Sequence, residues 1–120
     1  MKKVLVVEDD RLFLISLEWA LDKIGCQVAA VVDNAEDALL FLRKEQPDLI
    51  ITDISIKGKM NGLDLVRKVR ELHPVPVIFI TAFEDQELFR QASAIRHASF
   101  LVKPLTVATL RNTVQQLFSP

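Results

Sequence analysis

The sequence holds three acids, a threonine and a lysine at positions where polar side chains can meet and act together. Each lies just beyond a short apolar run: Glu8, Asp9, Asp53, Thr81 and Lys103. Any one of them alone is more simply a strand end that meets water. Parallel strands, however, end at one edge of a sheet, where ligands of open α/β folds bind. The shared placement of all five residues therefore predicts one crevice.

The residue types in this predicted crevice suit phosphoryl chemistry. Three carboxylates held close together repel one another unless a cation lies among them. A ligand set made only of oxygen atoms favours a hard ion such as Mg²⁺. Lys103 would add a positive charge and Thr81 a hydroxyl donor, which are aids to phosphoryl transfer. The pattern therefore predicts a Mg²⁺ site at which Asp53 carries a phosphoryl group, because carboxylates act as such nucleophiles.

Five apolar runs must position these residues. The runs are continuous and rich in Val and Ile, which is typical of strands covered on both faces of a parallel sheet: 4–7, 28–32, 49–51, 77–80 and 100–102. Apolar residues at spacings of three or four predict a helix after each run. This alternation predicts an α/β fold with helices on both faces of a parallel sheet.

The ends and inner faces of the helices also follow from residue types. Asn34 and Thr106 are expected N-caps, Gly25 an expected helix end, and Pro47 and Pro74 close the second and third helices. The expected inner faces hold Phe13, Leu17, Leu21 and Ile24; Ala38, Leu39 and Leu42; Leu65, Val66, Val69 and Leu72; Leu88, Ala92 and Ile95; and Leu110, Val114 and Leu117.

Length and composition exclude several classes of protein. The 120 residues fit one domain, expected to span 1–120. No apolar run approaches the roughly 18 residues that a membrane helix needs. Fifteen basic and sixteen acidic residues nearly cancel, so direct nucleic-acid binding is disfavoured. The single cysteine, Cys26, cannot form an internal disulfide, which indicates a reducing cytoplasm.

Five motifs in order resemble the receiver domain family of two-component response regulators: VLVVEDD at 4–10, PDLIITDI at 47–54, MNGLDLV at 60–66, PVIFITA at 76–82 and FLVKP at 100–104. The resemblance covers essentially the whole chain. It implies a flavodoxin-like, doubly wound, five-stranded parallel sheet of strand order 2-1-3-4-5 with five helices. It also implies a phosphorylation-switched signalling domain, not an enzyme, that assists its own phosphotransfer and dephosphorylation.

The resemblance assigns roles to residues around the predicted metal. Glu8 and Asp9 are similar to the acidic pair of the family, with Asp9 a direct ligand of Mg²⁺. Asp53 corresponds to the phosphoacceptor, and Ser55 stands where a backbone carbonyl completes the metal shell. Asp10 lies one position beyond the acidic pair, and we expect it to cap the first helix.

The resemblance also implies a switch. Thr81 and Lys103 correspond to the switch hydroxyl and the phosphate-binding lysine, and the peptide between Lys103 and Pro104 is expected to be cis. The switch aromatic, often Tyr in the family, is Phe100, which lacks a hydroxyl to hold it in solvent. We therefore expect the Phe100 ring to lie inward or to be mixed even without phosphate. The helix 4–strand 5–helix 5 face would be the signalling surface.

The resemblance implies the kinds of partner protein but no particular partner. The phosphoryl donor would be a sensor histidine kinase or a phosphotransfer protein, and the output domain or target remains open. Homodimer formation is also open, although Ser99 stands where a salt-bridged dimer of some DNA-binding members carries an acid. Ser55 and Phe83 orient water poorly, which predicts a long-lived phosphorylated state. An alternative is that Phe83 merely packs on its loop.

Two further departures from the family concern the backbone. Residues 56–59, IKGK, replace the usual Met-Pro and add one residue before Gly62, which should alter only the loop beside the site. His97 stands where a glycine usually precedes the last strand.

The sequence disfavours three other functions. A haloacid-dehalogenase-type phosphatase needs a second Asp two positions after the nucleophile, where this sequence has Ser55. A flavodoxin-type flavin binder would carry a Ser, Thr or Gly loop after the first strand, and residues 8–10 are all acidic. A non-phosphorylated interaction module with the same fold is disfavoured because the Asp, Thr and Lys positions are intact.

Overall fold

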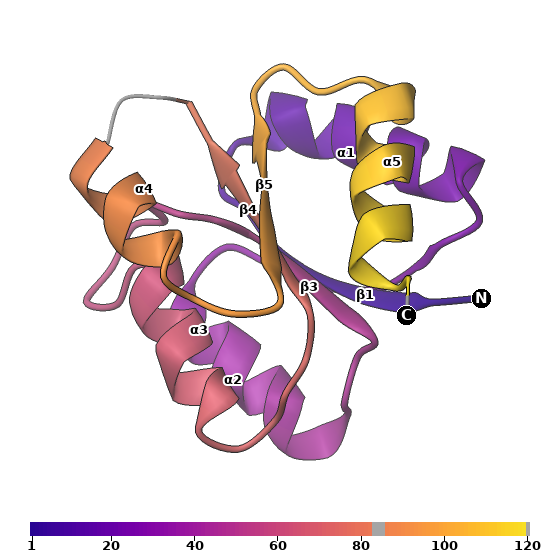
Figure 1. The fold of residues 1–120 in the computed structure, drawn as a ribbon. Helices are drawn as coiled ribbons and strands as arrows, with labels where there is room; N and C mark the ends of the chain where they lie inside the picture. The colour runs from indigo at the N-terminus through magenta and orange to yellow at the C-terminus, as the bar shows by residue number, and fades with distance from the viewer. Residues whose placement is uncertain (83–85, 120) are drawn as a thin grey trace.

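The computed structural model describes residues 1–82 and 86–119 (Figure 1). Within these residues, five strands alternate with five helices. The strands are β1 (Lys3–Val7), β2 (Gln27–Val32), β3 (Leu49–Asp53), β4 (Val77–Thr81) and β5 (Ala98–Val102). The helices are α1 (Arg11–Lys23), α2 (Ala35–Lys44), α3 (Gly62–Arg70), α4 (Gln86–Ala92) and α5 (Val107–Leu117). None of the described helices is long and apolar enough to cross a membrane.

The strands form one parallel sheet in the order β2-β1-β3-β4-β5, which confirms the predicted fold class. Helices α1 and α5 cover one face, and α2, α3 and α4 cover the other (Figure 1). The register aligns the carboxyl ends of the central strands: Val7 pairs with Thr52, Asp53 with Ile80, and Thr81 with Val102. The polar residues that follow these strands therefore share one edge.

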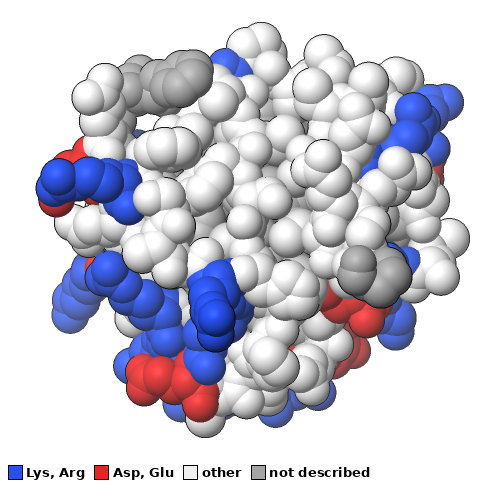
Figure 2. Space-filling model, viewed as in Figure 1, with Lys and Arg blue, Asp and Glu red and all other residues white. Residues whose placement is uncertain are grey.

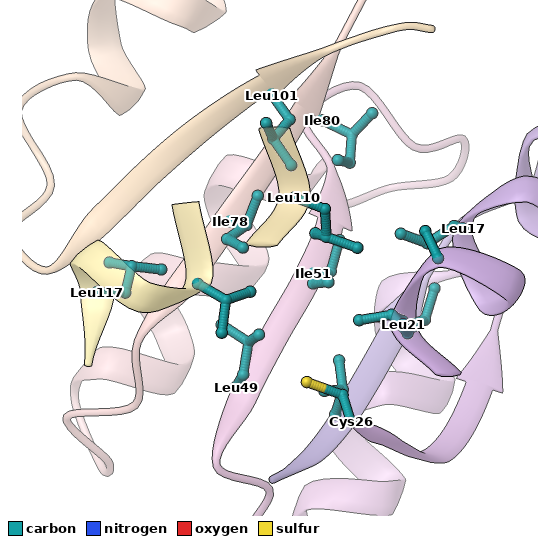
Figure 3. Close-up of a cluster of buried hydrophobic side chains, with 14 of the residues drawn as sticks. Leu17, Leu21, Cys26, Leu49, Ile51, Ile78, Ile80, Leu101, Leu110 and Leu117 are labelled. Atoms are coloured by element: carbon teal, nitrogen blue, oxygen red, sulfur yellow. The ribbon is translucent and has the colours of Figure 1, made fainter. Parts of the chain in front are cut away.

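Two apolar cores lie on opposite faces of the sheet. Alternate residues of β1 divide between them, because successive side chains of a strand point to opposite faces. Val4 and Val6 pack under α1 and α5, whereas Leu5 and Val7 pack under α2, α3 and α4. Figure 3 shows the first of these cores, including the buried Cys26. Burial on both faces explains why the central strands β1, β3 and β4 are continuous apolar runs.

The predicted N-caps are confirmed. Asp10 Oδ1 accepts a hydrogen bond of 3.1 Å from the Phe13 amide at the start of α1. Asn34 accepts from the Asp37 amide, and Thr106 forms a capping box with Thr109. Helix α1 ends at Lys23, and Gly25 follows with a φ of +82°, in the left-handed region that glycine tolerates.

The prediction of an inner, buried position was wrong for one residue. Leu72 is 77% exposed, because α3 ends at Arg70 and the helical period no longer applies beyond it. Helix α4 likewise ends at Ala92, before the expected Ile95. Ile95 nevertheless packs against the core from the turn that follows the helix.

The Arg70 side chain joins three segments at the amino ends of the strands. Its Nε donates to the carbonyl of Val75 and its Nη2 to that of His97, both at 2.8 Å, and its Nη1 donates to the carbonyl of Arg96. His97 has a φ of +57°, which fits its place where the family usually has glycine. Arg70 thus fastens the segment between α4 and β5 to α3.

Candidate functional site

The five residues singled out in the sequence converge at the carboxyl edge of the sheet. Glu8 and Asp9 follow β1, Asp53 and Thr81 are the last residues of β3 and β4, and Lys103 follows β5. Glu8, Asp9 and Asp53 each offer a carboxylate oxygen, and these three oxygens lie within 4.8 Å of one another. The predicted crevice is therefore present, with three acids close enough to share one cation.

Lys103 lies among the carboxylates. Its Nζ is 3.1 Å from Glu8 Oε1, 3.5 Å from Asp53 Oδ2 and 3.6 Å from Asp10 Oδ2. Burial alone would lower the pKa of the Lys103 ammonium, but its close contact with Glu8 and the charges of these three acids raise that pKa above its usual value. The ammonium also lies 4.5 Å from the centre of the Phe13 ring. Lys103 is thus held as a fixed cation.

Glu8 is the most buried acid of the site, at 4% exposure. Its Oε2 accepts hydrogen bonds of 3.0 Å from the amides of Asp9 and Asp10, which fix the turn into α1. Its Oε1 is buried without a well-directed hydrogen bond from the described residues, although the Lys103 ammonium is near. Burial, with the charge of Asp53, raises the pKa of the Glu8 carboxyl. This oxygen has spare capacity to accept a donor or face a cation.

Asp53 is held from one side and open on the other. Its Oδ1 accepts hydrogen bonds from the Ser55 amide at 3.0 Å and the Ser55 hydroxyl at 3.3 Å. Its Oδ2 faces Lys103, and 14% of the side chain is exposed. Asp53 is therefore oriented by its neighbours and still reachable by a small molecule.

The aromatic ring expected to take part in a switch packs inward. Phe100 is partly buried, and its ring stacks on that of Phe79 at a centroid distance of 5.5 Å. The ring of Phe89 contacts it at 4.7 Å from the side of α4. Near the site, the peptide between Lys103 and Pro104 is cis, as the resemblance implied. Phe83, to which the sequence assigned a role in phosphate lifetime, lies outside the described residues.

The donor set at this edge fits Mg²⁺. All three acids offer oxygen, which Mg²⁺ prefers, and Mg²⁺ commonly uses one or two carboxylates and keeps several waters. The buried Glu8 oxygen without a directed hydrogen bond gains a favourable partner if a cation, or water bound to one, lies before it. The sequence did not predict the contacts of Lys103 with Asp10 and Phe13. The signal for these contacts in the sequence was that Asp10 and Phe13 lie about one helical turn apart, so both side chains can face the same neighbour.

Comparisons with known proteins agree with this geometry. A profile of the response regulator receiver domain matches residues 4–115. The chemotaxis protein CheY-3 of Vibrio cholerae is 31% identical over 119 residues, which cover 97% of this chain and 91% of that protein.

Two solved structures have the same fold. The signal receiver domain of a modulated diguanylate cyclase from Desulfovibrio desulfuricans gives a TM-score of 0.89 at 31% identity, covering 98% of this chain and 93% of that one. The receiver domain of a sensor histidine kinase from Pseudomonas aeruginosa, which has a magnesium ion in its active site cleft, gives 0.84 at 26% identity and covers 98% of both chains. The profile match over nearly the whole chain shows that this protein belongs to the response regulator receiver domain family of two-component systems.

Proposed function

We propose that this domain, spanning residues 1–120, accepts a phosphoryl group on Asp53 from a sensor histidine kinase or a phosphotransfer protein. The observation that carries the proposal is the meeting of the Glu8 and Asp9 carboxylates and the Lys103 ammonium around the accessible Asp53. Mg²⁺ would be held by Glu8, Asp9, Asp53 and the backbone carbonyl of Ser55. When bound, this ion would neutralise charge on the phosphoryl oxygens.

The chain's own residues account for the remaining requirements of the reaction. Ser55 holds one oxygen of Asp53 in place, so the carboxylate meets the phosphorus atom in a fixed orientation. The bond from an Asp53 oxygen to phosphorus forms as the bond from phosphorus to the donor breaks. Lys103 then contacts the added phosphoryl oxygens and stabilises their negative charge. The same residues assist the later loss of phosphate to water.

The proposed switch couples Thr81, Phe100 and Pro104 to the surface made by α4, β5 and α5. A hydrogen bond from the Thr81 hydroxyl to the phosphoryl group would draw the end of β4 inward and favour the inward position of the Phe100 ring. Figure 2 shows few charged side chains over β5 and α5. From Ala98 to Ser119 only Lys103 and Arg111 are charged. Such a neutral surface suits an output partner or a second copy of the domain.

An apolar stripe on α1 suits the approach of the phosphoryl donor. Leu12, Ile15 and Trp19 are 80%, 68% and 58% exposed and lie on one side of the helix. Helix α1 begins two residues after Asp9 of the acidic pair, so a protein seated on the stripe would bring its phosphorylated residue close to Asp53. Trp19, the third residue of the stripe, is one of the proposed contacts.

We infer a signalling domain that is switched by its own modification, with no separate substrate, acting in the cytoplasm. The unpaired Cys26 supports a reducing compartment. In contrast, a dehalogenase-type phosphatase would need an acid at the position of Ser55, and the acidic turn at 8–10 would repel the phosphate of a flavin.

Asp53→Asn is expected to abolish phosphorylation. Incubation of the wild-type protein with acetyl phosphate and Mg²⁺ should add the mass of one phosphoryl group, because the donor reacts without a partner kinase. The amide is a far weaker nucleophile than the carboxylate, so the variant should show no added mass. Asp64→Asn, which removes an exposed acid from the first turn of α3, is the matched control and should retain the adduct. An adduct of equal yield in Asp53→Asn would contradict the assignment.

A further inference from the structure

A hollow of about 600 Å³ opens beside the acidic pair and is bounded by three different loops. Its walls come from the β1–α1 turn, the end of β2 and the loop between β3 and α3: Asp9, Asp10, Asp33, Asn34, Lys57 and Gly58. Because Asp9 and Asp10 adjoin the carboxylates around Asp53, this hollow forms part of the approach to the phosphoacceptor edge.

The charges along this approach oppose the substrate. Asp9, Asp10 and Asp33 are all acidic, and Glu8 and Asp53 add two further carboxylates behind them. The nearby Lys103 ammonium is already shared among three of these acids. Every phosphoryl donor is an anion, so the carboxylates that neither Mg²⁺ nor Lys103 neutralises repel it before it can reach the site.

Lys57 is the basic residue of this hollow, and the loop holds it at the rim. Ile56, directly before it, is buried at 3% exposure and anchors the loop to the core under α2 and α3. Gly58, directly after it, has a φ of +120°, which turns the chain in a way that other residues resist. In the described part of the chain, Lys57 forms no ion pair. Its ammonium therefore remains available to an incoming anion.

We propose that Lys57 is a specificity-determining residue that draws anionic phosphoryl donors into the site and favours those with the greatest negative charge. The inference rests on the proposed function, since it concerns the donors of the same reaction. Lys57 thus supplies positive charge at the one wall of the hollow that is not acidic.

Initial rates of phosphorylation with two small donors test this role. Acetyl phosphate carries more negative charge at neutral pH than phosphoramidate, whose nitrogen is protonated. At low ionic strength and saturating Mg²⁺, Lys57→Gln is expected to slow the reaction with acetyl phosphate about threefold, and Lys57→Glu about tenfold. The loss should be smaller with phosphoramidate and should largely vanish at roughly 1 M salt, where the Debye length is about 3 Å.

Lys59→Gln provides the matched control. Lys59 lies in the same loop and is exposed, but it does not line the hollow, so its replacement should leave both rates nearly unchanged. Equal losses in Lys57→Gln and Lys59→Gln, or a loss that is the same for both donors and insensitive to salt, would overturn the inference. If the wild-type protein reacts with neither donor, the proposed function fails first, and this outcome is distinct because it appears before any variant is compared.

Discussion

Asp9→Ala is expected to weaken Mg²⁺ binding by roughly 100-fold, at the upper end of the effect that the loss of an outer partner of a metal site has. Asp9 supplies one of the three carboxylate oxygens that lie within 4.8 Å of one another. Unlike Glu8, whose Oε2 is occupied by two amides, Asp9 is partly exposed. Its carboxylate is thus free to contact the ion directly, and Mg²⁺ has few other protein ligands to compensate for its loss.

Calorimetry and thermal unfolding with and without Mg²⁺ measure this effect. At ten times its dissociation constant, Mg²⁺ should add about 1.4 kcal/mol to the stability of the wild-type protein and almost nothing to that of Asp9→Ala. Asp33→Ala is the matched control, because Asp33 lies in the adjoining hollow but outside the cluster of three acids. Unchanged Mg²⁺ affinity in Asp9→Ala would remove Asp9 from the metal shell.

Gly62→Ala is expected to destabilise the protein by about 3 kcal/mol or more and to slow phosphorylation as well. A Cβ atom at Gly62 would lie 2.0 Å from the carbonyl oxygen of Asp53 and 3.1 Å from Cα of Ile54. Backbone atoms, and not a flexible side chain, occupy this space, so α3 or the end of β3 must move. Because Asp53 is the proposed phosphoacceptor, the strain falls on the reacting residue.

Chemical denaturation and the rate of reaction with acetyl phosphate would show both effects. Gly25→Ala is an informative control, since Gly25 has a positive φ but no atom within 4 Å of an added Cβ. It should cost only about 1 kcal/mol and leave the phosphorylation rate unchanged. If Gly62→Ala proves no more harmful than Gly25→Ala, the close approach of α3 to β3 does not constrain the site.

The sequence predicted most of the architecture because its signals were local. Continuous apolar runs marked strands buried on both faces, and Asp10, Asn34 and Thr106 marked helix starts through side chains that bond to nearby amides. The edge at which the polar residues meet also followed, because parallel strands share a direction. The strand order came from the family resemblance, since loop lengths and residue types alone do not specify it.

Other features depended on contacts between distant segments and were not predicted. The bonds of Arg70 to Arg96 and His97 join residues that are 26 and 27 positions apart, and no local pattern indicates them. The approach of Gly62 to Asp53 likewise depends on how α3 docks against β3. Leu72 was misplaced for the opposite reason, because a local period was extended past the end of its helix.

The Arg70 clamp has a mechanical consequence for the proposed signal. It ties the segment that leaves α4, at Arg96 and His97, to the carboxyl end of α3. Arg96 and His97 follow α4 by four and five residues, so these bonds hold the turn after the helix, and a shift near the beginning of α4 would tilt the helix relative to that turn. The turn held by Arg70 lies at the edge of the sheet opposite Asp53. The Phe89 ring on α4 contacts the Phe100 ring of β5. Small shifts at the phosphoacceptor edge would thus swing the exposed side of α4 while its far end stays in place.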